Sequence, residues 1–146
     1  MKTWCFVVAF LTALVVLPGM AKAQELSAGT ARALAELRSG AEVLQVRPAG
    51  DGRSIRFMRG RLTLPSTRPA GQIVRDLLAR RGALFNVYDV DDLVVRRELN
   101  LGASRVIRLG QTVNGVPVVG ADLTALLDRN GQVRWVIQSL AEPVVS

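Results

Sequence analysis

Two Asn-Gly pairs, each flanked by apolar residues, constrain this chain more than any other feature. They are Asn114-Gly115 in "QTVNGVPVVGADL" and Asn130-Gly131 in "DRNGQVRWVI". Asn-Gly between alternating apolar runs is the strongest short-range signal for a β-hairpin with a two-residue turn. Residues 104–113, 116–128 and 132–140 are therefore predicted to be three successive antiparallel strands.

Alternation along these strands predicts which side chains face a core. Five apolar side chains of the middle strand are expected on one face: Val119, Ala121, Leu123, Ala125 and Leu127. Gly120, Asp122, Thr124 and Asp128 are expected on the other. In the last strand, Val133, Trp135 and Ile137 are expected to share a face. A sheet with one apolar face needs helices to cover it.

Two segments have the spacing of amphipathic helices. In residues 25–40 one face is formed by Leu26, Thr30, Ala33, Leu34 and Leu37, and Ser39-Gly40 predicts the helix end. In residues 72–82 the apolar stripe is formed by Ile73, Val74, Leu77 and Leu78, and Gly82 is expected to end the helix. Both helices are amphipathic enough to lie on a sheet.

Residues 42–48 and 53–64 have strand composition and are separated by the turn-rich "PAGDG". Alternation in the second run is irregular, and Gly60 predicts a β-bulge there. Residues 83–92 are expected to form a loop packed through Leu84 and Phe85, followed by a strand at 93–99. The predicted fold class is α+β: an antiparallel sheet, with a C-terminal meander of Asn-Gly hairpins, covered by two helices.

Residues 1–23 have the three parts of a secretory signal peptide. These are Lys2, the twelve-residue apolar run at 6–17, and the small-x-small "AKA" at 21–23. The run is shorter than the roughly 20 residues of a membrane span, which disfavours an uncleaved anchor. We therefore expect a single secreted domain at 24–146, extracellular or periplasmic, with no stable membrane span after cleavage.

Removal of Lys2 and Lys22 with the signal leaves 17 arginines against 12 acidic residues, a net charge of +5. The arginines are spread from Arg32 to Arg134, and the segment has only four aromatic residues. A nucleic-acid site needs clustered charge with interleaved aromatics, so a solvated surface is favoured and no nucleic-acid partner is expected. The charge still suits an acidic protein partner or an anionic cell surface.

The residue types that are missing exclude most catalytic chemistry. The chain has no His, its single Cys is Cys5 within the predicted signal, and no Lys follows residue 22. His-based triads, His zinc sites, thiolate nucleophiles and Schiff bases are therefore excluded. No Gly-rich phosphate loop is present either. We expect no enzymatic activity, no metal and no cofactor.

The one acidic cluster is Asp89, Asp91 and Asp92 in "YDVDDL". Read as a calcium loop, it would need Gly at the sixth position and Glu at the twelfth, where Val94 and Asn100 stand. A solvated loop rich in turn-forming Asp is the favoured interpretation, and a weak calcium contact of another type is the alternative.

The stretch 82–140 resembles the fungalysin/thermolysin propeptide (FTP) domain, found in the prosegments of secreted zinc metallopeptidases. Ten residues carry the core of the likeness: Arg108, Gln111, Asn114, Gly115, Val116, Pro117, Val118, Gly120, Asp128 and Gly131. "FMRGRL", a Pro-led helix and "GALF" extend it upstream, over most of 53–140. The sequence departs from the family at Leu109, Val113 and Val119, where aromatics are frequent, and at Gly110, where a Gln is usual.

The resemblance implies an FTP/cystatin-like fold and a prosegment role: binding a cognate secreted metallopeptidase, inhibiting it, and assisting its folding. The chain would act on a separate peptidase, or would be the prosegment of a longer zymogen, which an "HExxH" motif encoded beyond codon 146 would reveal. An extracellular module for anionic surfaces is the third alternative. The candidate fold or partner-contact residues are Arg108, Gln111, Asn114, Gly115, Pro117, Val118 and Gly120. For Asn114, Gly115, Pro117 and Gly120, a backbone role is sufficient explanation.

Overall fold

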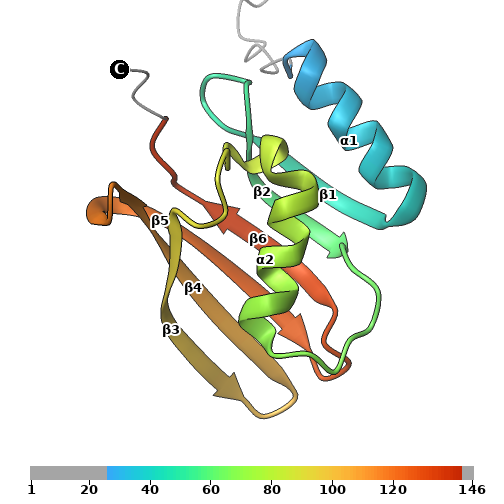
Figure 1. Cartoon of the computed structure of the whole chain (residues 1–146). Helices are drawn as coiled ribbons and strands as arrows, with labels where there is room; N and C mark the ends of the chain where they lie inside the picture. The colour runs from blue at the N-terminus through green and yellow to red at the C-terminus, as the bar shows by residue number, and fades with distance from the viewer. Residues whose placement is uncertain (1–25, 143–146) are drawn as a thin grey trace, which may run out of the picture.

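In the computed structural model, which describes residues 26–142, two helices lie on one side of a six-stranded antiparallel sheet (Figure 1). The elements are α1 (Ala28–Gly40), β1 (Glu42–Pro48), β2 (Ile55–Arg61), α2 (Ala70–Arg81), the 3₁₀ helix η1 (Gly82–Phe85), β3 (Leu93–Leu101), β4 (Ser104–Val113), β5 (Val116–Asp128) and β6 (Val133–Gln138). The strand order is β1-β2-β6-β5-β4-β3. The predicted α+β class and the C-terminal meander are confirmed, and β1 and β2 extend the same sheet.

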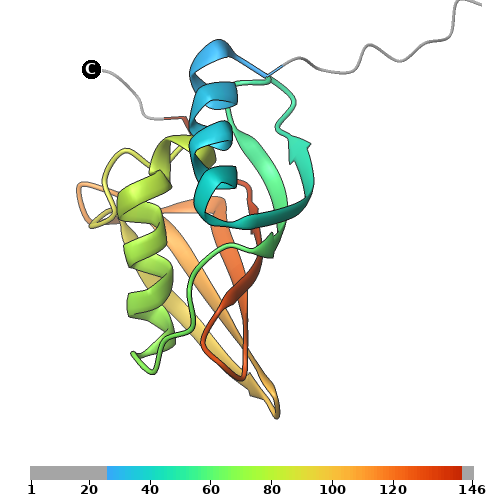
Figure 2. The ribbon, with the colours of Figure 1, turned by 90° about the vertical axis from the view of Figure 1, so that its right-hand side faces the viewer.

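The helices bury the faces that their spacing predicts. Thr30, Leu34 and Leu37 of α1 are buried, as is the α2 stripe of Ile73, Val74, Leu77 and Leu78. Ser27 caps α1, because its Oγ accepts a hydrogen bond from the Thr30 N–H. Figure 2 shows the sheet from its edge, with both helices on the same side and the other side uncovered.

The two Asn-Gly pairs form different turns. Asn114 and Gly115 both have positive φ, 51° and 77°, and directly join β4 to β5, as a type I′ turn requires. Asn130-Gly131 lies in a longer connection, residues 129–132, in which only Gly131 has positive φ, 71°. The Asp128 side chain organises this loop by accepting hydrogen bonds from the Asn130 and Gln132 N–H groups. The prediction of a two-residue turn was therefore wrong for the second pair.

Three of the five register shifts in the sheet are β-bulges whose extra residue is an arginine. The register shifts leave Arg56 of β2, Arg96 of β3 and Arg134 of β6 without a cross-strand partner at the shift. A bulge lets two consecutive residues point to the same side. Accordingly, Ile55 and Met58 are both buried, as are Val133 and Val136, while the pairs between them point away from the core. Val133 therefore does not share a face with Trp135 and Ile137, contrary to the prediction.

We call the uncovered side of the sheet the open face and define it by its paired rows. One row is Leu99, Val106, Leu126, Trp135 and Arg59. The next row is Arg97, Arg108, Thr124, Ile137, Phe57 and Arg47. The bulge residues Arg56, Arg96 and Arg134, together with Gly110, Asp122 and Asp128, complete it.

The structure refines two predictions that concern glycines. The bulge near Gly60 exists, but its extra residue is Leu44 of β1, and a side chain at Gly60 would overlap the Glu42 carbonyl oxygen. As predicted, α2 ends at Arg81 with Gly82 as the next residue, but Gly82 is αR and begins η1. The left-handed residue that ends this segment is Asn86, at φ 62°.

Within residues 26–142, no helix is both long and apolar enough to cross a membrane. The predicted signal peptide lies outside the described residues.

Candidate partner-binding site

Four of the seven candidate residues meet at one groove. Arg108 of β4 and Pro117, Val118 and Gly120 of β5 line a groove of about 440 Å³ at the end of the open face. We call it the Gly120 groove; it is completed by Arg96, Arg97, Gly110, Val119 and Asp122. Asn114 and Gly115 are exposed at the tip of the same hairpin, and Gln111 points to a different pocket.

A kink at Gly120 shapes this groove. The pairing of β4 with β5 passes from Gly110–Asp122 to Thr112–Pro117, and Gly120 has a φ of 77°. The kink turns Val119 outward, so that this side chain is 99% exposed. The prediction that Val119 lies on the core face was therefore wrong.

Ser139, which follows β6, holds the kink in place. Its Oγ donates a hydrogen bond of 2.9 Å to the Gly120 carbonyl oxygen, and its N–H donates one of 2.8 Å to the Asp122 carbonyl oxygen. The sequence contains no motif that singles out Ser139.

Arg108 forms an ion pair across the groove. Its Nη2 donates a hydrogen bond of 2.7 Å to Asp122 Oδ2. The pKa of Arg108 is raised, first by this hydrogen bond and then by the negative charge of Asp122. Asp122 therefore neutralises the charge of Arg108 locally.

Arg96 and Arg97 add two more cations to the groove, and sequence reasoning missed both. Gly110 provides the room for Arg96, since a β-carbon on Gly110 would lie 2.5 Å from Arg96 Nε. Gly110, which stands where the family usually has a Gln, therefore leaves space for the Arg96 side chain. The signal that could have revealed it is the broken alternation in "VVRREL", because two consecutive arginines in a strand share a face only at a bulge.

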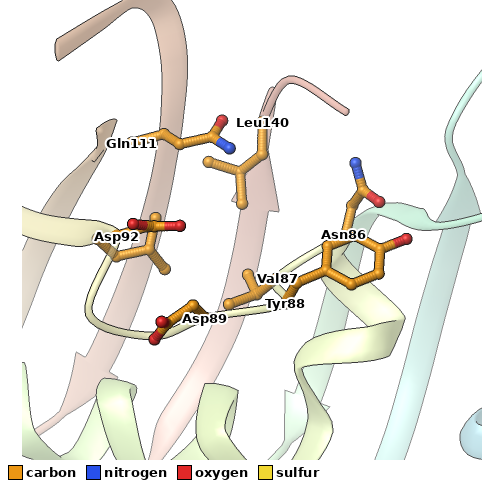
Figure 3. Close-up of a pocket in the computed structure, with 8 residues that line it drawn as sticks. Asn86, Val87, Tyr88, Asp89, Asp92, Gln111 and Leu140 are labelled. Atoms are coloured by element: carbon orange, nitrogen blue, oxygen red, sulfur yellow. The ribbon is translucent and has the colours of Figure 1, made fainter. Parts of the chain in front are cut away.

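Gln111 ties down the segment that follows β6. Its Oε1 accepts a 2.9 Å hydrogen bond from the Ala141 N–H, and its Nε2 donates a 3.3 Å bond to the Ala141 carbonyl oxygen. Asn86 Nδ2 donates to the same carbonyl at 3.5 Å. Figure 3 shows Gln111 and Asn86 on either side of Leu140, around a pocket of about 30 Å³. A pocket this small holds about one water molecule and does not suit a larger ligand. The hydrogen bonds of Gln111 therefore have a structural role.

Replacing Gln111 is expected to release that segment. Gln111→Ala removes two hydrogen bonds to Ala141 and should lower the free energy of unfolding by about 1 kcal/mol. The Ala141 amide should also exchange with deuterium faster than in the unmodified chain. Gln72→Ala, at an exposed position of α2, is the control and should change stability by less than about 0.5 kcal/mol. Unchanged exchange at Ala141 in Gln111→Ala would contradict this role.

The acidic loop makes no metal cage. Asp89 accepts a hydrogen bond from the Asp91 N–H, and Asp91 pairs with Arg75 at 3.1 Å. Within residues 26–142, no group of three or more His, Cys, Asp or Glu side chains is placed to hold a metal ion. Local interactions therefore account for Asp89 and Asp91.

Comparison with known families bears on the segment that forms the groove and meander. Residues 91–140 match the family model described as the Fungalysin/Thermolysin Propeptide Motif. The match covers the whole of β3 to β6 and does not extend upstream to 53–90. No curated protein and no solved structure matches the chain significantly, so the cystatin-like likeness stays a prediction.

The FTP motif implies a peptidase propeptide role, in association with a metallopeptidase domain. Propeptide domains of this family are not themselves catalytic. In this structure the motif residues have structural roles: the Asn114-Gly115 turn and the Gly120 kink fix the shape of the β4–β5 hairpin, and Gln111 holds the segment that follows β6. Arg108, Pro117 and Val118 are the candidate residues that remain on an accessible groove.

Proposed function

We propose that residues 24–146 form one secreted propeptide-like domain that binds a thermolysin-type zinc metallopeptidase. Binding inhibits the peptidase and assists its folding, in cis or in trans. The observation that carries the proposal is the FTP motif, which spans all four strands of the meander. The occurrence of this motif in secreted proteases favours an extracellular or periplasmic location.

The fold suits this role because it presents a preformed surface. The core includes a continuous cluster of side chains from both helices, η1 and five of the strands, from Leu34 to Val136. A rigid domain that binds the folded state of a partner stabilises that state by mass action. The same bound domain lowers peptidase activity when it covers the approach to the cleft.

Purified residues 24–146, added to a thermolysin-type peptidase from the same organism, should slow hydrolysis of a small fluorogenic peptide. In a second assay, the same chain should raise the yield of active peptidase recovered after dilution from denaturant. Mass spectrometry at each time point shows whether the added chain is intact, which separates inhibition from competition by a digested substrate. Serum albumin at equal concentration is the control. No change in rate or recovered yield at high molar excess would contradict the proposed function.

A further inference from the structure

The open face is more apolar than a solvated sheet face needs to be. An antiparallel sheet with one covered face normally presents polar side chains on the other. Here Leu99, Val106, Leu126 and Trp135 are paired neighbours in one row across four strands. Ile137 and Phe57 are adjacent in the next row. The centre of the face is therefore a continuous strip of large apolar side chains.

Arginines surround this strip without acidic partners. Five of them, Arg47, Arg56, Arg59, Arg96 and Arg97, form no ion pair with a carboxylate among residues 26–142. Arg47 instead lies over the Phe57 ring, 6.0 Å from its centroid. The bulges contribute Arg56 and Arg96 directly.

The excess charge of the chain is concentrated on this face. Its two aspartates, Asp122 and Asp128, are engaged by Arg108 and Arg134. Seven arginines against two aspartates give +5, which equals the net charge of residues 24–146, because the other ten arginines are matched by ten acidic residues. Arginines that are dispersed in the sequence are thus gathered by the fold.

The chemistry of the strip distinguishes a protein partner from a polyanion. Polyanion binding draws on phosphate or sulfate contacts, and single-stranded nucleic acid also needs aromatic rings on which bases stack. The strip is mainly aliphatic, with Leu99, Val106, Leu126 and Ile137. An apolar strip flanked by arginines, with Trp135 beside Arg59 at the end of its row, has the composition of a protein–protein interface, in which arginine and aromatic residues are enriched.

We propose that the open face is the surface that docks on the peptidase, and that its counterpart is an acidic patch with an apolar centre. This inference rests on the proposed function and adds the side of the domain and the chemistry of the partner surface. Complementary charge of this kind mainly raises the association rate and selects the partner, while the apolar centre slows dissociation.

Surface plasmon resonance tests the proposal, with a thermolysin-type catalytic domain from the same organism as the probe. The glutamate of its HExxH motif is replaced by glutamine, so that it cannot digest the chain. The face variant is Arg59→Glu with Arg97→Glu. The matched control is Arg38→Glu with Arg80→Glu, which makes the same change of charge at exposed positions of α1 and α2.

We expect the face variant to bind about 10- to 100-fold more weakly, chiefly through a slower association rate, and the control to stay within about 2-fold. Association of the unmodified chain should slow steeply with added salt. Arg59→Lys with Arg97→Lys should retain most of the affinity, because the charge remains. A second pair tests the strip: Ile137→Thr should weaken binding, and Leu64→Thr, in an exposed loop, should not. Circular dichroism of each variant verifies its fold.

Each other outcome overturns the inference in a different way. If the unmodified chain binds and the face and control variants bind equally, the open face is not the docking surface, while the proposed function stands. If the unmodified chain neither binds the peptidase nor changes its activity or refolding, both fail. If heparin, single-stranded DNA or anionic vesicles bind more tightly than the peptidase, and the face variant loses that binding, the surface is a polyanion site.

Discussion

Gly131→Ala is expected to lower the free energy of unfolding by about 3–5 kcal/mol, whereas Gly115→Ala should lower it by only about 1 kcal/mol. Both glycines follow an asparagine and both have positive φ, 71° and 77°. A side chain at either position therefore has the same conformational strain. The difference lies in their surroundings, because a β-carbon at Gly115 would have no atom within 4 Å, and one at Gly131 would overlap the Ser66 carbonyl oxygen.

The overlap at Gly131 cannot be relieved by rotating a side chain, since the obstacle is backbone. Ser66 is held in place by its own N–H, which donates a 2.9 Å hydrogen bond to the Asn130 carbonyl oxygen. Ile73 Cδ1 of α2 would lie 3.3 Å from the added carbon on another side. Urea denaturation with both variants measures the difference, as a shift of the midpoint at constant slope. Equal losses would show that the loop at Ser66 moves freely.

The two turns also show where sequence reasoning reaches its limit. Local preference for positive φ predicts that both Asn-Gly pairs are turns, and each connects neighbouring strands. The turn type of the second pair depends on Asp128, whose side chain bonds to two loop N–H groups, and on the distant Ser66. A contact between residues 66 and 130 is a property of the tertiary fold, which no local pattern contains.

The same distinction applies to the open face. Helix spacing predicts the buried stripes of both helices, since each stripe is read within one element. The open face depends on three bulges, and a bulge changes the side to which every later residue of its strand points. Irregular alternation was visible around Arg56 and in "VVRREL", but its consequence, the gathering of arginines across five strands, requires the register of the whole sheet.

The candidate motif residues were easier to find than to interpret. Gln111 belongs to the motif, yet its two hydrogen bonds to Ala141 show that it holds the chain after β6. Ser139 holds the Gly120 kink in a similar way, because its Oγ donates a hydrogen bond to the Gly120 carbonyl oxygen, and it belongs to no motif. The residues to which Gln111 and Ser139 bond, Ala141 and Gly120, lie 19 or more residues away along the chain. Neither hydrogen bond could therefore be predicted from residue spacing.

Phe85→Ala should destabilise the domain by about 3–5 kcal/mol, because it removes a fully buried ring and leaves a cavity. Phe85 is 0% exposed in η1, the short helix that contacts α1, α2 and β2 and so joins both layers. Tyr88→Ala, three residues on, is the matched control: Tyr88 is 76% exposed, and its loss should change stability by less than about 0.5 kcal/mol.

Phe85→Leu refines this test, since it keeps most of the apolar volume and should cost about 1 kcal/mol or slightly more. Thermal unfolding followed by circular dichroism measures all three variants. The position of η1 matters for function, because η1 leads into the loop from which β3 starts, and β3 carries Arg96 and Arg97. A loss of less than about 1 kcal/mol in Phe85→Ala would mean that the core closes over the gap, and that η1 does not fix the position of the meander.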